Sequence, residues 1–309
     1  NNDAECEAAR NASAALAANL APLYRSYVSS RIDMARMEEY FLAAQARELD
    51  EVREEIAVAA AEEEMTSASS LGRLDVGASV NCLNAMFAQC LPRLQALMTD
   101  SSNAAAATDI TPDAAALLEE TRLLVVCATH ILTDECEGET PMAPESVVRA
   151  CAADPDACAA GAAGLIQTLM GLAEFQASAV ASNPSDPRLS PLLARTVLWF
   201  VRRWAPAYVL PQPGEYSGAP AGGILAAWAT PEAASHALAF CSTLCLHYLV
   251  RWPQEGAVQE EAAGLLSALG KRGKGARDLL ARTPSFRRIA ALHSVTAGLR
   301  DNASDDQVR

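Results

Sequence analysis

The chain has 309 residues, of which 51% are hydrophobic and 20% are charged, and this apolar share is large enough to build a core, which excludes wholesale disorder. Alanine and leucine, both strong helix formers, dominate the apolar residues, and only 5% of residues are aromatic, so an all-β or open α/β fold is not expected. The 24 Lys and Arg against 38 Asp and Glu give a net charge of −14, which argues against direct nucleic-acid binding, because such binding relies on neutralising phosphates.

In chain order, the spacing of apolar residues first predicts two helices, at about 4–20 and about 30–65, the second heavily charged. The segment from Thr66 to Gly72 interrupts this pattern, and a third helix is expected from about 75 to 98. Residues 99–111 have little apolar periodicity and are expected to form an inter-helix loop.

A Thr-Pro-Asp sequence at 111–113 is typical of a helix start, since it supplies a capping side chain, a proline in the first turn and an acid there. The helix that it begins is expected to run to about 132. An acidic loop then carries four carboxylates within six residues, Asp134, Glu135, Glu137 and Glu139.

The rest of the chain is predicted to be helical apart from short breaks. The expected helices lie at about 160–181, 190–210, 231–251, 254–269, 276–282 and 284–298. Residues 211–223 are expected to be an inter-helix loop and residues 301–309 a polar tail.

The overall pattern of nine or ten helices without a convincing strand predicts an all-α protein. Long helices need neighbours to cover their apolar stripes, and stacking antiparallel pairs into an α-solenoid of HEAT/ARM-like repeats is the usual solution at this length. We therefore expect residues 1–309 to form a single helical-repeat segment. A compact helical bundle is the alternative architecture.

The chain begins without a methionine or a signal peptide, which suggests a segment of a longer protein. No run reaches the roughly 18 uninterrupted apolar residues of a membrane helix, since the longest candidate, Leu189–Leu210, contains Arg195, Arg202 and Arg203. Membrane insertion is therefore not expected. The nine cysteines lack a short-spaced framework, which is typical of free thiols in a reducing compartment.

Two groups of cysteines are candidate chemical sites. Cys241, Cys245 and His247 suggest a metal site, but His247 points to another side of the helix, so packing of the two cysteines in the core is the favoured interpretation. Cys151 and Cys158 flank a turn, and nothing in their spacing selects a disulfide. No metal and no cofactor is expected.

An enzyme is not expected either, because the histidines at 130, 236 and 293 have no catalytic partners at a recognisable spacing and no nucleophile motif occurs. The segment Gly270–Gly275 lacks the spacing of a phosphate-binding loop. It is interpreted as a basic inter-helix loop, extended by Arg277, Arg282, Arg287 and Arg288. It is either a solvated turn or a surface that meets an acidic partner.

The acidic loop matches a calcium site poorly. It is either a solvated loop or an acidic surface for a basic ligand. The helix predicted at about 190–210 carries the aromatic residues Trp199, Phe200, Trp204 and Tyr208. Because Trp is costly to expose to water, we expect these four to form structural core, with Arg202 or Arg203 stacked on an indole.

Three blocks of sequence also carry a resemblance to a known family. They are Gly138–Pro141 with Pro144 after a Leu-rich helix, Leu189–Leu192 leading into Val197–Ala205 and Tyr208–Leu210, and Leu265–Leu269 before the charged break at Gly270–Arg277. In order and spacing these blocks resemble the exportin-4 family of nuclear transport receptors, in the importin-β (karyopherin) superfamily. The resemblance covers about 110–300, and the first hundred residues fit only as compatible helices.

The resemblance implies a helical-repeat nuclear export receptor without enzymatic activity that shuttles between nucleus and cytoplasm. Its implied partners are Ran-GTP, nucleoporins and a protein cargo such as the hypusine-bearing translation factor 5A. On this basis Asp134, Glu135, Glu137 and Glu139 are candidate cargo-binding residues on an acidic surface. The principal Ran contacts are expected to lie outside this segment. A helical-repeat scaffold or adaptor with no transport role is the alternative.

Overall fold

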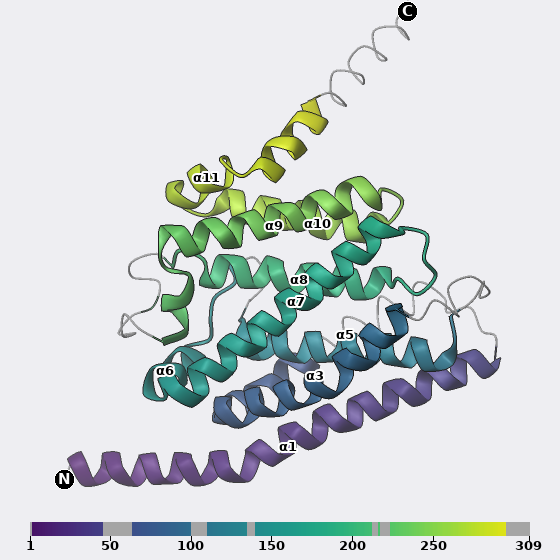
Figure 1. Cartoon of the computed structure of the whole chain (residues 1–309). Coiled ribbons are helices and arrows are strands. Elements are labelled where there is room, and N and C mark those ends of the chain that lie inside the picture. The colour runs from purple at the N-terminus through teal and green to yellow at the C-terminus, as the bar shows by residue number, and fades with distance from the viewer. Residues whose placement is uncertain are drawn as a thin grey trace, which may run out of the picture.

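A computed structural model describes residues 2–45, 64–99, 110–134, 140–211, 216 and 223–294 of the chain. This described part consists of helices stacked side by side, and its only β-type pairing is one isolated bridge between Asp134 and Met142 (Figure 1). The predicted all-α helical-repeat fold is confirmed.

The described helices follow one another along the chain. Their bounds are α1 (Asn2–Gln45), the 3-10 turn η1 (Arg73–Asp75), α3 (Val76–Thr99), α5 (Pro112–Leu132), α6 (Glu145–Ala153), the π turn η2 (Pro155–Ala159), α7 (Ala160–Ser182), α8 (Pro191–Tyr208), the 3-10 turn η3 (Gly223–Trp228), α9 (Pro231–Arg251), α10 (Gly256–Lys271) and α11 (Lys274–Leu280). Residues 64–72 and 284–294 are also helical.

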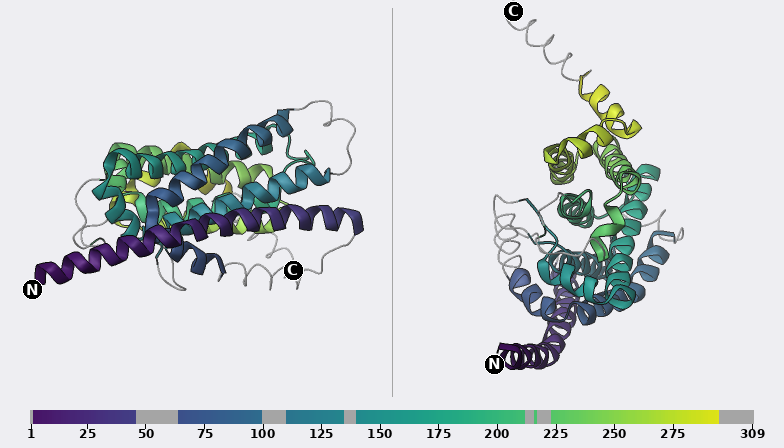
Figure 2. Two further views of the ribbon diagram at one scale, coloured as in Figure 1. Left: turned by 90° about the horizontal axis from the view of Figure 1, so that it is seen from below. Right: turned by 90° about the vertical axis from the view of Figure 1, so that its left-hand side faces the viewer.

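The helices form two rows that lie against each other. One row contains α3, α7, α9 and α11 in succession, and the other contains α1, α5, α8 and α10. Across the rows, α3 packs on α5, α7 on α8 and α9 on α10. Helices α7 and α8 run in opposite directions, as do α9 and α10 (Figure 1), and the end-on view in Figure 2 shows the layers rising from α1 to the C-terminal helices. Each layer therefore contacts mainly the layers next to it.

Helices α5, α8 and α9 begin with the same capping arrangement. Thr111, Ser190 and Thr230 each precede a proline, and their side-chain oxygens accept hydrogen bonds from the backbone amide three residues on, at 3.3, 3.1 and 3.2 Å. The side chain satisfies an amide that has no partner inside the helix, and proline has no N–H to lose there. The start predicted at Thr111 is confirmed.

The prediction of two separate helices at 4–20 and 30–65 is wrong, because α1 continues unbroken through Pro22 to Gln45. A proline inside a helix costs about 3 kcal/mol. Beyond it, α1 buries a stripe that packs mainly against α5, namely Tyr24, Val28, Ile32 and Ala35. Burial of this stripe offsets the local cost, since each large apolar side chain contributes about 1.5–3 kcal/mol. Residues 46–63 of the predicted second helix lie outside the described part.

The segment Thr66–Gly72, expected to interrupt the helices, is itself helical, because Met65, Ala68 and Ser69 turn one side into the core. Helix α6 was not predicted, and it is short, with Val147, Val148 and Cys151 buried. The expected loops at 99–111 and 211–223 lie largely outside the described residues, as does the tail at 301–309.

By length and composition, two stretches of the structure, Pro155–Ser182 and Pro231–Arg251, are apolar enough to cross a membrane. The sequence predicted no membrane helix because no run of apolar residues was long enough without interruption. Both stretches lie in the packed row of α7 and α9, and buried helices of a core share this composition. They are therefore weak indications of a membrane span.

The outer side of α1 carries a second apolar stripe. Its members are exposed large side chains at helical spacing, Leu16, Leu23, Met34, Met37 and Phe41. They lie away from the stripe that packs against α5. The first layer therefore presents apolar surface on the side opposite its neighbour.

Candidate functional site

The acidic loop follows the end of α5, and its base is closed by a small antiparallel bridge. The amides of Asp134 and Met142 each donate to the other's carbonyl oxygen at 2.8 Å. The Asp134 side chain is 52% exposed, and its Oδ2 lies 3.2 Å from Nη1 of Arg73. Glu135, Glu137 and Glu139, the other predicted cargo-binding residues, lie outside the described residues.

Arg73, from the turn η1, holds the C-terminal end of α5. Its Nε donates to the carbonyl oxygen of His130 at 3.1 Å, and Nη2 donates to the same oxygen and to that of Thr133 at 3.1 Å. The last carbonyls of a helix lack partners within the helix and carry partial negative charge, so a guanidinium satisfies and stabilises them. The remaining nitrogen, Nη1, pairs with the carboxylate of Asp134. Arg73 therefore fixes the position of Asp134, the first residue of the acidic loop.

A glycine allows η1 to come this close to α5. A Cβ at Gly72 would lie 2.7 Å from Cδ1 of Ile131 and 3.0 Å from the ring of Tyr24. Both side chains are buried, so neither has room to withdraw. Only a residue without a Cβ fits here without displacing the core.

Helix α8 supplies a second set of contacts to the same end of α5. Nε of the buried Arg203 donates to Oγ1 of Thr133 at 3.1 Å, and the guanidinium carbon lies 5.0 Å from the ring centroid of Trp199. The hydroxyl of Tyr208 donates to the carbonyl oxygen of Leu132 at 2.6 Å. The side chain that stacks on an indole is thus Arg203, whereas Arg202 pairs with Glu261 of α10 at 2.9 Å.

His130 lies within this polar cluster and is 4% exposed. Its pKa is lowered to about 4, first by burial and then by the charges of Arg203 and Arg73, which Asp134 only partly offsets. The imidazole, whose ring centroid lies 5.5 Å from that of Trp199, is therefore neutral at physiological pH. It serves as packing at the loop's base, and its buried Nε2 has no hydrogen-bond partner among the described residues.

Tyr216 fastens the other end of the loop. Its hydroxyl accepts a hydrogen bond from the amide of Ala143 at 3.0 Å and donates to the carbonyl oxygen of Ala207 at 2.8 Å. The acidic segment is therefore carried on a base that is tied to η1, α5 and α8.

Of the four residues predicted as structural core on α8, Phe200, Trp204 and Tyr208 are buried, while Trp199 is partly exposed. Trp204 and Tyr208 both meet the indole of Trp228 edge-on, at centroid distances of 5.3 and 6.0 Å. Trp228 in η3 completes this aromatic cluster. Its role was not predicted, because η3 comes from a separate segment of the chain.

The cysteine clusters are packed in the interior. Cys241 and Cys245 are fully buried, which raises the pKa of Cys241 to about 12, while His247 lies partly exposed on another side of α9. The sulfurs of Cys151 and Cys158 lie 3.8 Å apart as free thiols. Among the described residues, no group of three His, Cys, Asp or Glu side chains is placed to hold a metal.

The basic segment at 270–275 is not an open loop. Helix α10 extends to Lys271, and α11 begins at Lys274. Arg272 is buried, with Nη2 donating to the carbonyl oxygen of Leu210 at 3.3 Å. Nε of Arg287 donates to the carbonyl oxygen of Ala281 at 3.1 Å. Arg288, another arginine of this basic group, lines a groove.

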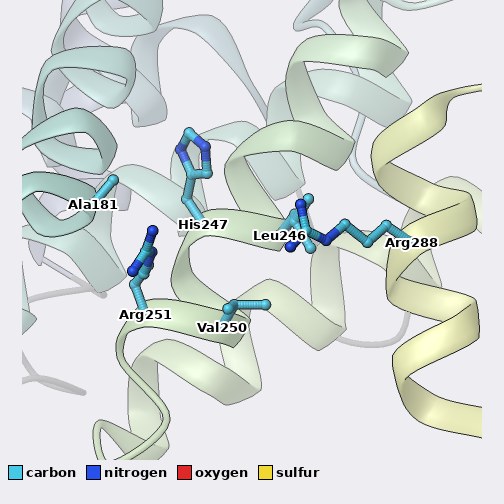
Figure 3. A pocket seen from close by; sticks show the side chains of 6 residues that line it. All are labelled: Ala181, Leu246, His247, Val250, Arg251 and Arg288. Atoms are coloured by element: carbon cyan, nitrogen blue, oxygen red, sulfur yellow. The ribbon is translucent and has the colours of Figure 1, made fainter. Parts of the chain in front are cut away.

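That groove lies where α7, α9 and the helix at 284–294 meet, and it has a volume of about 340 Å³ (Figure 3). Its lining residues are Ala181, Leu246, His247, Val250, Arg251 and Arg288. They come from three segments that are far apart in the sequence. No local pattern therefore indicated the groove.

Comparison with known families accounts for this architecture. The sequence model of the exportin-4 family matches residues 6–302. No curated protein matches the chain. The match includes the first hundred residues, for which the sequence alone gave no specific resemblance. Because it spans nearly the whole two-row array, the chain belongs to the exportin-4 family of nuclear transport receptors.

Proposed function

We propose that the chain acts as part of a nuclear export receptor that binds protein cargo cooperatively with Ran-GTP. The observation that carries this proposal is the family match along the whole of a stacked helical array. Such a receptor shuttles between nucleus and cytoplasm through contacts with nucleoporins. It needs no catalytic residues of its own.

The mechanism follows from the way the layers touch. Since each layer contacts mainly its neighbours, a small rotation at each contact adds up to a large change in the curvature of the array. Ran-GTP and cargo would each bind one curvature better than another, so each would raise the affinity for the other by the same factor. Hydrolysis of GTP removes one of these two contributions and releases cargo.

The proposed cargo surface is the acidic loop with Asp134, Glu135, Glu137 and Glu139. A net charge of −14 favours fast, salt-sensitive encounter with a basic cargo such as the hypusine-bearing translation factor 5A. Asp134 already pairs with Arg73. We therefore assign cargo contact chiefly to the three glutamates, and to Asp134 the placing of the loop.

The chain is further proposed to be one segment of a longer array. The support is the outer stripe of α1, with Leu23, Met37 and Phe41 each more than half exposed. An apolar stripe at helical spacing is the kind of surface that a further helix covers in stacked repeats. This part of the proposal concerns extent and does not alter the cargo surface.

The experiment is a binding assay of the full-length protein with Ran held in its GTP or GDP form. An export receptor retains Ran-GTP and not Ran-GDP, whereas a scaffold or adaptor without a transport role is indifferent to the nucleotide. Lysine substitution of Glu135, Glu137 and Glu139 together is expected to weaken binding of a basic cargo at least tenfold and to leave Ran binding unchanged. Unchanged cargo binding would rule out this loop as the cargo surface.

A further inference from the structure

The groove between α7, α9 and the helix at 284–294 combines an apolar lining with cationic groups. Ala181, Leu246 and Val250 supply the apolar part, and Val250 is 42% exposed. A volume of about 340 Å³ is at the small end of the range of ligand pockets, roughly 300–1,000 Å³. The groove therefore suits one or two side chains of a bound peptide better than a large cofactor.

The polar groups of the groove are all nitrogen-bearing. His247 and Arg251 lie one turn apart on α9 and extend on the side of Ala181, and Arg288 reaches from the last described helix toward Leu246 (Figure 3). None of the described lining residues carries a carboxylate. Within the described part of the chain, neither arginine forms an ion pair.

This local charge contrasts with the chain as a whole, which carries a net charge of −14. Two guanidiniums beside exposed apolar surface match a ligand that has carboxylates next to an apolar side chain, because guanidinium and carboxylate pair in a two-pronged geometry. Arginine is also enriched at the energetically important centres of protein interfaces. The chain as a whole is negatively charged, so its field opposes the approach of a long polyanion such as RNA.

We infer that this groove is a second docking site, for an acidic segment of a partner protein in which carboxylates flank one apolar side chain. It differs in sign from the proposed cargo surface, and it binds its ligand whether or not the chain acts in export. Arg251 and Arg288 hold the carboxylates, and Leu246 and Val250 receive the apolar side chain.

The test uses the 309-residue chain and a fluorescein-labelled peptide of glutamates around a central leucine, followed by fluorescence anisotropy. The chain is expected to bind this peptide with an affinity that falls as salt is raised. Arg251→Glu with Arg288→Glu should weaken binding by about tenfold or more, because two attractions become repulsions. Val250→Asp should weaken it by about fivefold through the same repulsion.

The control is Arg195→Glu, an exposed arginine on α8 whose reversal changes net charge by two units, as much as either of the two arginine substitutions in the groove. It should leave the affinity within about twofold. The same peptide with glutamines should bind at least tenfold more weakly than the glutamate peptide. Circular dichroism confirms that each variant retains its helices.

Four results of the peptide assay would overturn the inference. They are the absence of peptide binding by the unaltered chain, an unchanged affinity in the double variant, an equal loss in Arg195→Glu, and equal binding of the glutamine peptide. A single-stranded RNA that binds with the same dependence on Arg251 and Arg288 would also overturn it, by assigning the groove to phosphates. None of these results bears on Ran or on the acidic loop, so the two proposals fail separately.

Discussion

The carboxylate of Glu120 on α5 lies 2.7 Å from the guanidinium of Arg36 on α1, and the glutamate side chain is only 8% exposed. Arg93 on α3 reaches the same carboxylate oxygen at 3.0 Å. One buried charge therefore joins α5 to α1 and α3, two of the helices that pack against it. This contact is a polar link between the first layers of the array.

Substitution of both arginines tests this link. Arg36→Ala or Arg93→Ala alone should lower the free energy of unfolding by about 1 kcal/mol, because the remaining guanidinium still neutralises Glu120. The double variant leaves a buried carboxylate without a partner and should lose about 3 kcal/mol or more. Urea denaturation measures these values, with Arg195→Ala as an exposed control. Losses that simply add would show that the two arginines act independently.

Gly72→Ala tests the close approach of η1 to α5. The new Cβ would meet Cδ1 of Ile131 at 2.7 Å, and overpacking of this kind costs about 1–3 kcal/mol. Ile131→Val removes that Cδ1 and should restore part of the loss in the double variant. Gly171→Ala on α7, where a Cβ meets nothing within 4 Å, should instead stabilise by about 0.5–1 kcal/mol. Equal effects at Gly72 and Gly171 would contradict the close approach of Gly72 to Ile131.

The buried, neutral His130 is expected to make the free energy of unfolding depend on pH. Its pKa is about 4 in the folded chain and about 6.5 when unfolded, so the unfolded state binds more protons between these values. The contribution of the neutral His130 to the free energy of unfolding is fully present above pH 6.5 and is lost as the pH falls toward 4. Between pH 7.5 and 5.5 the loss from this group should be about 1 kcal/mol.

The control for this pH effect is His130→Phe, which removes the titrating group and keeps a ring beside Trp199. The decrease in unfolding free energy from pH 7.5 to 5.5 should be about 1 kcal/mol smaller in this variant than in the unaltered chain. An identical decrease in both proteins would mean that His130 is not buried as a neutral ring.

Arg73→Lys tests how the base of the acidic loop is held. A single ammonium cannot serve the carbonyls of His130 and Thr133 and the carboxylate of Asp134 together, so stability should fall by about 1–2 kcal/mol. Amide hydrogen exchange at Asp134 and Met142, which form the bridge, should become faster. Asp134→Asn removes only the exposed ion pair and should cost less than about 1 kcal/mol. Equal effects of the two variants would show that the carbonyl contacts of Arg73 contribute nothing.

Much of the helical architecture was predictable because its signals are local. Apolar spacing located the helices that begin after Ser190 and Thr230 to within a few residues, and at Thr111 a capping residue followed by proline marked the start as well. The predictions failed where packing against residues distant in the sequence determines whether a helix continues. Helix α1 passes through Pro22 because its buried stripe rests on α5, and no property of the first 45 residues alone reveals that neighbour.

The site was less predictable for the same reason. The acidic loop was visible as a charge cluster, but its anchor Arg73 lies 57 residues before the His130 carbonyl that it contacts. The groove lined by Arg251 and Arg288 joins helices from three parts of the chain. Such pairings depend on how the layers stack, and spacing along one helix carries no information about them.

Ran-GTP and cargo are proposed to bias one shared curvature of the array, and a thermodynamic cycle measured by calorimetry tests this coupling. For the full-length protein, we expect Ran-GTP to tighten binding of the hypusine-bearing translation factor 5A by about 5–150-fold, and cargo to tighten Ran-GTP binding by the same factor. Ran-GDP should have no such effect. A cargo affinity that is the same with Ran-GTP, with Ran-GDP and without Ran would contradict the account.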